Sequence, residues 1–358
     1  MTVVPPATRP RPARLTMPAL VVGAGAVVVA VVLGVALGPV SLNPLGVAAE
    51  LLNLIPGVHL HSGLTDQQAA IVTQLRLPRV VLGLIVGSML ALAGGCYQGV
   101  FRNPLADPYL LGVAAGAGLG ATVAVALGLS TGDRVGVPAF AFAGALLGVF
   151  LAYGLGAARL GRAAGTPVRT PTTLLLAGVA VVAFLTAIQT YVLQRNVETI
   201  REVYSFILGS LATSGWSDVR LAVPYAAAAA VVVLAHRREL DVFSLGDEEA
   251  TSLGLHPRRS RLILLVAASL GTAAAVSVSG LIAFVGIIVP HVIRLLAGTS
   301  YRVILPLSML AGGAFLVVCD LVARVVLAPT EVPIGVVTAF LGAPFFLLVL
   351  RTANRVGL

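Results

Sequence analysis

One charge-dense stretch interrupts this otherwise apolar chain: RRELDVFSLGDEEATSLGLHPRRSR, residues 237–261. The 358-residue chain is 58% hydrophobic and only 10% charged, whereas soluble domains average about 25% charged residues. The centre of the stretch, Leu245–Leu255, is predicted to form a short helix with acidic residues near its start and arginines on both flanks. The rest of the chain has few charged residues. One charged element in such a chain indicates a docking surface for a partner.

The rest of the chain consists mainly of apolar runs that are long enough to cross a membrane. A helix that crosses a hydrocarbon core of about 30 Å needs about 20 apolar residues. The fold class predicted from these runs is an all-α membrane protein, a polytopic bundle of about ten transmembrane helices. Residues 198–212 are predicted to form a shorter, partly amphipathic helix that does not span. The predicted spans are 18–38, 80–100, 109–129, 136–157, 172–193, 218–235, 262–279, 281–297, 303–323 and 335–350.

Ten spans place both chain ends on the same side of the membrane, and the arginines indicate which side. All 23 basic residues are arginine, and with the N-terminus inside they are more frequent in the inner segments than in the outer ones. Because positive charge favours the cytoplasmic side, both termini and residues 237–261 are predicted to be cytoplasmic. The predicted organisation is a disordered cytoplasmic tail (1–17), one ten-helix domain (18–351) and a cytoplasmic C-terminal tail (352–358).

The composition also limits the chemistry of the chain. Its net charge of +9 at pH 7 lies in loops between apolar runs, which predicts membrane orientation and no nucleic-acid binding. The chain has no lysine, so it cannot form a GxxxxGK[ST] phosphate-binding loop, whose lysine contacts the β- and γ-phosphates. No cofactor is expected to bind this chain, and any ATP-derived energy must come from another subunit.

Cysteine and histidine give only weak metal signals. Cys96 and Cys319 lie in apolar runs and are predicted to be buried free thiols. His59 and His61 lie two residues apart in an outer loop, a spacing that does not define a ligand set. No metal site is therefore predicted.

Glycines recur inside the predicted spans. Gly112, Gly116 and Gly120 are spaced four residues apart, which puts them on one face of a helix. Because small residues let membrane helices approach closely, this pattern predicts helix packing. A nucleotide-binding loop is not predicted, because no strand–loop–helix context surrounds the glycines.

Two segments interrupt their helices with proline. The first is GGCYQGVFRNPLADPYLLGVAAGAG, residues 94–118. Pro104 and Pro108 exclude a continuous helix through it, and Asn103 and Asp107 are residues that can cap a helix starting near Pro108.

The second segment is SGLIAFVGIIVPHVIRLLAGTSYR, residues 279–302. Pro290 is predicted to kink or break its helix and to free a backbone carbonyl, and His291 and Arg294 follow on the inner half. The residues alone leave two interpretations open for both segments: tight turning and kinked packing, or a cytoplasmic gate or motor contact.

Six motifs occur in an order that resembles a known family. They are RLPR (Arg76–Arg79), GxxLALAGxxxQxxFRNPLADPxLLGxxxGA (Gly87–Ala117), LGDEEATSLGL (Leu245–Leu255), GLIAFVGIIVPHVIRLLAG (Gly280–Gly298), the Asp320/Arg324 pair and EVPIGVVTAFLGAPFFLLVLR (Glu331–Arg351). Together they resemble the FecCD-type permeases of bacterial ABC importers for iron–siderophore complexes, haem and vitamin B12. The resemblance covers residues 18–351.

The resemblance implies a non-catalytic permease subunit of the cytoplasmic (inner) membrane. Its expected partners are a second permease copy, two cytoplasmic ABC ATPase subunits that use ATP and Mg, and an extracytoplasmic binding protein. A bulky cargo would pass between the two permease copies. A ferric siderophore is the expected cargo on family frequency, followed by haem and then cobalamin.

The resemblance also implies roles for particular residues. The cytoplasmic helix would sit in a groove of the ATPase and transmit its closure, with a glycine near each end. The residues of this expected coupling helix are Leu245, Gly246, Asp247, Glu248, Glu249, Ala250, Thr251, Ser252, Leu253, Gly254 and Leu255.

Three arginines, Arg76, Arg79 and Arg324, match positions that would dock carboxylates of the binding protein at the external mouth. Bidentate guanidinium–carboxylate pairing suits this role. Anchoring of span ends is the alternative, and for Arg324 so is a local pair with Asp320, one turn earlier.

A translocation gate near the cytoplasmic end is the least direct of these implications. The resemblance assigns it to Asn103, Leu105 and Thr172. The prolines and polar residues Pro104, Pro108, Pro290, His291 and Arg294 would mark kinks at the same end.

Two other classes of function fit the sequence less well. An ion-coupled secondary transporter needs ionisable residues near the membrane midplane, and only Asp320 is a candidate. An intramembrane enzyme is disfavoured, because no HExxH, GxSxG or aspartate-dyad pattern occurs at suitable positions.

Overall fold

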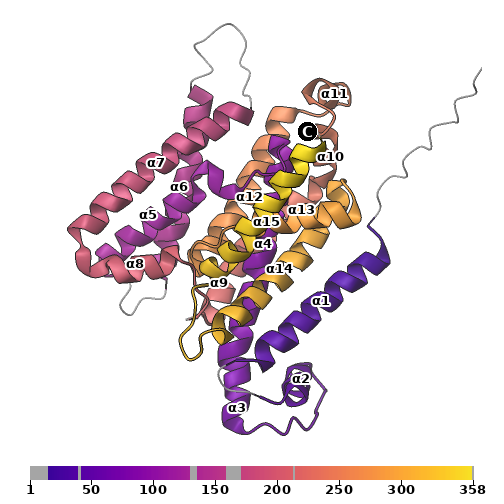
Figure 1. Ribbon diagram of the computed structural model, residues 1–358, viewed down its shortest axis with the longest axis vertical. Helices are drawn as coiled ribbons and strands as arrows, with labels where there is room; N and C mark the ends of the chain where they lie inside the picture. Colours follow the sequence, from indigo (N-terminus) through magenta and orange to yellow (C-terminus); the bar gives the residue numbers. More distant parts are fainter. Residues whose placement is uncertain (1–14, 39–41, 130–134, 159–170, 213, 357–358) are drawn as a thin grey trace, which may run out of the picture.

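The computed structural model describes residues 15–38, 42–129, 135–158, 171–212 and 214–356, and this part of the chain is a bundle of helices (Figure 1). Residues 1–14 of the predicted tail lie outside it. The helices are α1 (Met17–Ala36), α2 (Pro44–Leu52), α3 (Asp66–Ala70), η1 (Ile71–Arg76), α4 (Leu77–Phe101), η2 (Pro108–Leu111), α5 (Val113–Ala126), α6 (Gly136–Ala158), α7 (Pro171–Arg195), η4 (Val197–Thr199), α8 (Ile200–Ile207), α9 (Trp216–Ala235), α10 (Arg237–Phe243), α11 (Asp247–Ser252), α12 (Pro257–Ser279), α13 (Val285–Ala297), α14 (Tyr301–Val325) and α15 (Ile334–Val356).

The predicted membrane bundle is confirmed. Among the described residues, 7 helices are long and apolar enough to cross a membrane, and α5, α13 and α15 are shorter apolar helices at the remaining predicted spans. The predicted short helix at 198–212 is present but shorter, since α8 covers only Ile200–Ile207. Among the elements that the sequence analysis did not predict is α10, directly before the expected coupling helix.

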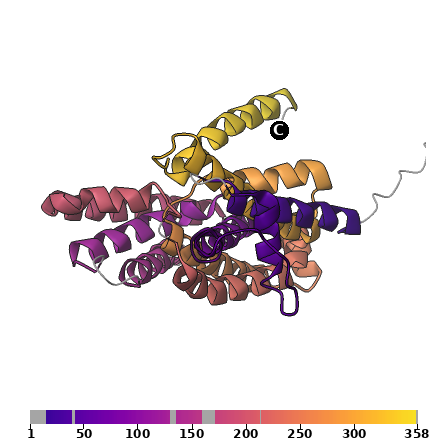
Figure 2. The same cartoon turned by 90° about the horizontal axis from the view of Figure 1, so that it is seen from below.

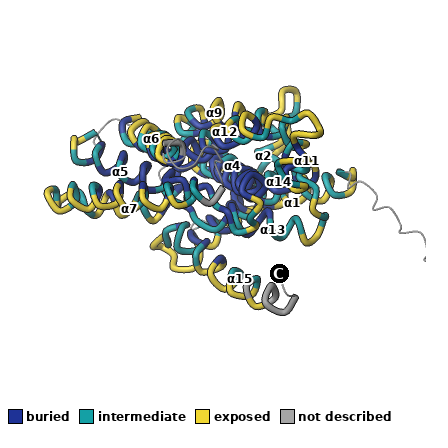
Figure 3. Tube along the Cα trace, turned by 90° about the horizontal axis from the view of Figure 1, so that it is seen from above, coloured by how far each residue is buried: buried dark blue, intermediate teal, exposed yellow. Residues whose placement is uncertain are grey.

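Helix α4 lies at the centre of the bundle and packs against α14, α12, α13 and α9. Figure 3 shows buried residues concentrated around α4 and α14. Glycine makes this possible, since a Cβ at Gly87 would overlap the carbonyl oxygen of Gly312, and one at Gly94 would overlap that of Gly286. Lipid provides no hydrophobic driving force for helices to associate, so close packing of their backbones stabilises the bundle instead.

The predicted glycine stripe packs α5 against α6. A Cβ at Gly116 would overlap the carbonyl oxygen of Gly144, and a Cβ at Gly144 would overlap that of Gly116. A Cβ at Gly120 would overlap the carbonyl oxygen of Phe140. The packing interpretation of these glycines is thus confirmed.

The predicted span 281–297 begins four residues later than expected, because residues 280–284 are not helical. Gly280 and Phe284 adopt positive φ angles of 69° and 70°. Ser210 N donates to Ser279 O (2.9 Å) and Leu281 N donates to Phe206 O (3.2 Å). Irregular backbone is tolerated at membrane depth only where protein satisfies its polar groups, and these bonds do so.

Helix α15 stands apart from the other helices at its C-terminal part (Figure 2). It continues to Val356, beyond the predicted span end at residue 350 and into the predicted tail. Its apolar side chains are open, with Phe340 77% and Leu348 61% exposed. An apolar groove of about 660 Å³ separates it from α8 and the start of α5.

Candidate functional site

The expected coupling helix lies at one end of the bundle, called here the α11 end (Figure 1). It is shorter than the predicted segment, since only Asp247–Ser252 is helical. Gly246 and Gly254 have φ angles of 121° and 82°, which disfavour residues with a Cβ. With α10 it forms a compact unit, the α10–α11 hairpin (residues 237–255).

Apolar side chains seat this hairpin on the bundle. Leu240, Phe243 and Ala250 are each fully buried. A Cβ at Gly99 of α4 would crowd the Leu240 side chain, so α10 lies directly against the end of α4. The inner face of the hairpin is therefore fixed by packing.

A carboxylate at the start of α11 ties the hairpin to α12. Asp247 accepts two hydrogen bonds from Arg261, at 2.8 Å from Nη1 and 2.6 Å from Nη2. Arg102, just beyond α4, adds a longer ion pair at 3.6 Å. The Arg261 hydrogen bonds hold the pKa of the Asp247 carboxyl below its usual value, so Asp247 is ionised at neutral pH.

A second carboxylate ties the hairpin to α14. Asp241 accepts hydrogen bonds from the backbone N of Tyr301 (2.6 Å) and from Ser300 Oγ (2.9 Å). Arg302 pairs with it at 3.3 Å. Asp241 thereby satisfies the first N–H of α14, although it lies far from that helix in sequence.

The outer face of the hairpin is open. Leu245 and Leu253 are 60% and 63% exposed, and Glu248, Glu249 and Thr251 between them are also exposed. The outer face thus has an apolar side chain near each end and acidic side chains between them. Such a face suits a partner protein whose groove is apolar at its ends and positively charged in the middle.

The proline of α13 has the predicted effect on a carbonyl. The helix continues through Pro290, so it is not broken, but the Gly286 carbonyl four residues earlier cannot receive an N–H from proline. Gln98 Nε2 donates to this carbonyl at 3.2 Å. The Gln98 Oε1 then accepts a hydrogen bond from Arg294 at 2.9 Å.

The loop after α4 contains two of the predicted gate residues, Asn103 and Leu105. Asn103 does not cap a helix, because its Oδ1 accepts from Leu105 N within the loop (2.9 Å). Asp107 does cap one: it accepts from Tyr109 N at 2.8 Å at the start of the 3-10 turn η2. The third predicted gate residue, Thr172, has a side chain that lies outside the described part of the chain.

The three predicted docking arginines gather at the opposite end, the α3 end. Arg76 Nη1 donates to the carbonyls of Val35 and Ala36 (both 2.9 Å), and Arg324 Nη2 donates to that of Gly34 (2.9 Å). These bonds satisfy the last carbonyls of α1. Arg76 and Arg324 are 7% and 3% exposed and cap α1, which agrees with the anchoring alternative, and their docking role stays a prediction.

Arg79 bridges two carboxylates at the same end. It pairs with Asp320 at 2.8 Å and with Glu331 at 2.9 Å. Asp320 also pairs with Arg324 (3.1 Å), as the local-pair alternative predicted. Because Glu331 is a third exposed and Asp320 is 2% exposed, Glu331 is the partner that water and other solutes can reach.

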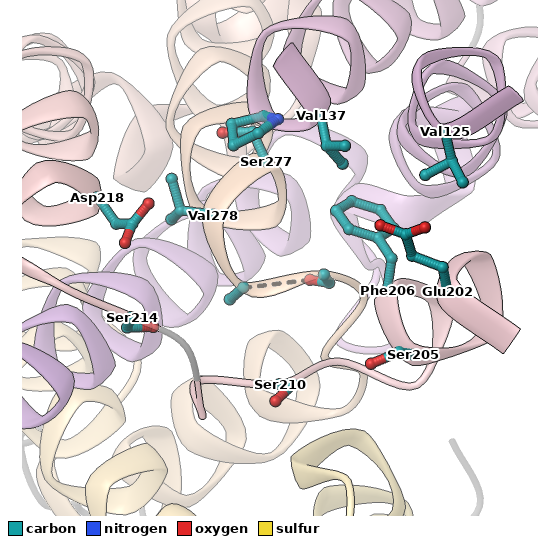
Figure 4. A pocket seen from close by; sticks show the side chains of 13 residues that line it. Val125, Val137, Glu202, Ser205, Phe206, Ser210, Ser214, Asp218, Ser277 and Val278 are labelled. Carbon is teal, nitrogen blue, oxygen red and sulfur yellow. Dashed lines mark hydrogen bonds between the residues drawn. The ribbon is translucent and has the colours of Figure 1, made fainter. Parts of the chain in front are cut away.

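A polar cavity of about 490 Å³ opens between α5, α6, α8, α9 and the end of α12. Figure 4 shows Asp218 and Glu202 at opposite sides of it, with Ser205, Ser210 and Ser277 between. Asp218 accepts from Gly215 N (2.8 Å) and so caps α9. Nowhere in the described ranges do three His, Cys, Asp or Glu residues gather as metal ligands.

Sequence reasoning missed Gln98, Asp241, Arg261 and Glu331 as partners in these networks. Gln98 and Glu331 lie in quoted motifs, and Asp241 and Arg261 lie in the charge-dense stretch, but the sequence gives no signal of their partners. Cys96 and Cys319 are buried and free, as predicted.

Comparison with known proteins gives the same answer as the motifs. The model of the FecCD transport family matches residues 26–352. The chain belongs to this family. It is 44% identical to the cobalamin import system permease protein BtuC of Halobacterium salinarum over 307 residues, 86% of this chain and 80% of that protein.

Other relatives carry different cargo names. The Fe(3+) dicitrate transport system permease protein FecD of Escherichia coli is 37% identical, covering 80% of this chain and 88% of FecD. The haemin transport system permease protein HmuU of Yersinia pestis is 36% identical, covering 78% and 83%.

A solved structure of a metal-chelate-type ABC transporter, in an inward-facing conformation, resembles the fold. Its TM-score is 0.79 at 26% identity, covering 94% of this chain and 100% of the other. This FecCD family member is a multi-pass membrane protein and a permease subunit of an ABC importer. Subunits of this class are not catalytic.

Proposed function

We propose that the chain forms the pathway of a binding-protein-dependent importer for a bulky metal chelate, in the cytoplasmic (inner) membrane with the α11 end inside. The observation that carries this proposal is the α10–α11 hairpin. It packs closely against α4 and is tied by carboxylates to α12 and α14, while its outer face is open.

The hairpin is the proposed contact with an ABC ATPase that uses ATP and Mg. Closure of the ATPase would push on the open face between Leu245 and Leu253. Because packing against α4 and the carboxylates of Asp247 and Asp241 connect the hairpin to three helices, a rigid-body movement of the hairpin reaches the central packing around α4. The gate at Asn103, Leu105 and Thr172 stays a prediction.

A second copy of this chain is the proposed partner of α15. The exposed apolar side of α15 and the groove of about 660 Å³ beside it suit a partner in the membrane, with lipid as the surrounding solvent. Two copies facing each other along α15 would enclose a wide apolar path. Such a path binds a polar chelate weakly, which favours its release.

The external binding protein is proposed to dock at the α3 end through Arg79. Its carboxylate would take the place of Glu331, because Arg79 is otherwise fully occupied. Docking in this form is an exchange of one carboxylate for another. It would steer association and set its salt dependence more than it adds affinity.

The cargo class follows from the relatives. Their names include cobalamin at 44% identity, and Fe(3+)-hydroxamate, Fe(3+) dicitrate and haemin at 36–37%. All four are bulky metal chelates. We place a corrinoid first on identity, with a ferric siderophore as the second candidate because most of the named relatives transport ferric chelates.

The test is uptake by proteoliposomes that contain the chain, its ATPase and its binding protein. Cobalamin and a ferric hydroxamate are offered in parallel, with and without ATP inside. The proposal expects one cargo to accumulate only with ATP. Accumulation driven by an ion gradient in the absence of ATP would support a secondary transporter and overturn the proposal.

A further inference from the structure

A pocket of about 300 Å³ lies at the α11 end, between the end of α4, α10, α13 and the start of α14. It lies beside the predicted gate residue Asn103 and the α10–α11 hairpin, but the proposed transport function assigns no ligand to it. Its lining is strongly polar for a membrane protein. The polar residues around it are Gln98, Arg102, Asn103, Ser244, Arg294 and Tyr301.

Arg294 brings a half-buried positive charge to this pocket, with its Nη1 atom fully buried. Its Nη2 donates to Gln98 Oε1 at 2.9 Å and to Tyr301 Oη at 3.5 Å. Its Nη1 is buried and has no hydrogen-bond acceptor within the described ranges, nor does any carboxylate there pair with it. A buried guanidinium N–H without an acceptor is energetically costly.

The surrounding groups hold Arg294 in place. Gln98 is 1% exposed, and because its Nε2 is committed to the Gly286 carbonyl, its Oε1 faces Arg294. The ring of Tyr301 lies 5.9 Å from the Arg294 Cζ. The pocket is thus preorganised by the kinked packing around Pro290.

The loop after α4 adds two further donors. Arg102 is 41% exposed. Within the described part of the chain it has one ion pair, 3.6 Å to Asp247, which is weak because Arg261 holds Asp247 more closely at 2.6 Å. Asn103 has its Oδ1 bonded to Leu105 N, so its Nδ2 is directed elsewhere. The last turns of α4 and α13 contribute only about half a negative charge each, less than the charges of Arg102 and Arg294 together.

We propose that this pocket binds one phosphate group, from free inorganic phosphate or from the headgroup of an anionic phospholipid. Guanidinium groups match phosphate oxygens in geometry and charge, and an amide N–H adds a third donor. The phosphate would supply Arg294 with its missing counter-charge and join α4 to α13. The position of the pocket, at the end of apolar spans, makes both sources accessible.

The first experiment uses the full-length chain in nanodiscs of phosphatidylcholine. Its thermal unfolding midpoint is measured against sodium phosphate, with sodium chloride at equal ionic strength as the reference. A parallel series replaces part of the phosphatidylcholine by phosphatidylglycerol without added phosphate. A saturable rise in the first series identifies free phosphate, and a rise in the second identifies the lipid headgroup. No rise in either series overturns the proposal.

Variants locate the site. Arg102→Gln removes an exposed side chain and so preserves the fold, while Arg294→Gln removes the buried one. Each is expected to weaken the apparent affinity by about tenfold or more, the equivalent of one charge-assisted hydrogen bond. Arg259→Gln, an exposed arginine of α12 outside the pocket, is the matched control. An equal loss in this control would show a general charge effect and contradict the assignment, even where Arg294→Gln fails to fold.

Discussion

Asp247 and Asp320 are both held by two arginines, yet their surroundings give them different roles. Asp320 is 2% exposed and lies in a closed network at the α3 end, whereas Asp247 is 46% exposed at the hairpin. Removing one partner of a buried pair leaves an uncompensated charge, so Asp320 is a structural residue. Asp247 can be changed with a smaller loss of global stability, which makes it the better probe of function.

Asp247→Asn is expected to loosen α11 locally. Because Asp247 is 46% exposed but Arg261 only 14%, the global free energy of unfolding should fall by about 1–2 kcal/mol. Amide hydrogen exchange in α11 should nevertheless rise several-fold relative to Glu248→Gln, a change on the same helix at a carboxylate without a described ion pair. Equal exchange in the two variants would contradict the assigned role of the Arg261 pair.

The same pair predicts a pH dependence. Since Arg261 lowers the pKa of Asp247 in the folded chain, the stabilisation is complete above the ordinary carboxyl value of 3.8 and is lost as pH falls through the lower folded value. Exchange in α11, corrected for intrinsic rates, should therefore be the same at pH 7 and pH 5. A rise between these values would show that the pair does not hold α11.

Glu331→Gln is expected to strengthen docking of the binding protein several-fold, because it frees Arg79 from its exposed partner. The effect should shrink at high salt. Affinity is measured by titrating the binding protein onto the purified permease, with the exposed Glu198→Gln as the control for loss of one negative charge. Unchanged or weaker binding would show that Glu331 does not compete at Arg79.

At the scale of the element, apolar run length predicted most helices correctly, because a membrane span is determined by its own composition. The interruption at residues 280–284 could not be predicted in this way. It depends on Phe206 and Ser210, which supply backbone partners from another part of the chain. The connections of the hairpin were missed for the same reason, since Asp241 meets Tyr301 and Asp247 meets Arg261 only after folding.

The glycines give a test of element packing. Gly116→Ala should destabilise the chain by about 1–3 kcal/mol, because its Cβ would overlap the Gly144 carbonyl of α6. Gly154→Ala in α6 is the matched control, since nothing lies within 4 Å of its Cβ, and helix propensity favours alanine by about 1 kcal/mol. Thermal unfolding in detergent compares the two; a Gly116→Ala midpoint at or above that of Gly154→Ala would contradict close α5–α6 packing.

At the scale of the whole molecule, the α3 end, the α11 end and helix α15 each present a different kind of surface. The α3 end presents Arg79 and Glu331, and α15 leaves apolar side chains exposed. The hairpin lies at the opposite, α11 end (Figure 1). The central helix α4 joins the ends, since Arg79 lies in its first turn and Arg102 directly follows it. A movement of the hairpin can thus reach the external mouth through one packed helix.

The most direct test of this account removes the open face of the hairpin. Leu245→Ser with Leu253→Ser is compared with wild type in proteoliposomes that contain the ATPase and the binding protein, and ATP-driven cargo uptake is measured. The account predicts that uptake falls by about tenfold or more while the permease remains folded and ATP hydrolysis continues. Uptake at the wild-type rate in this double variant would contradict the claim that the hairpin transmits the work of the ATPase.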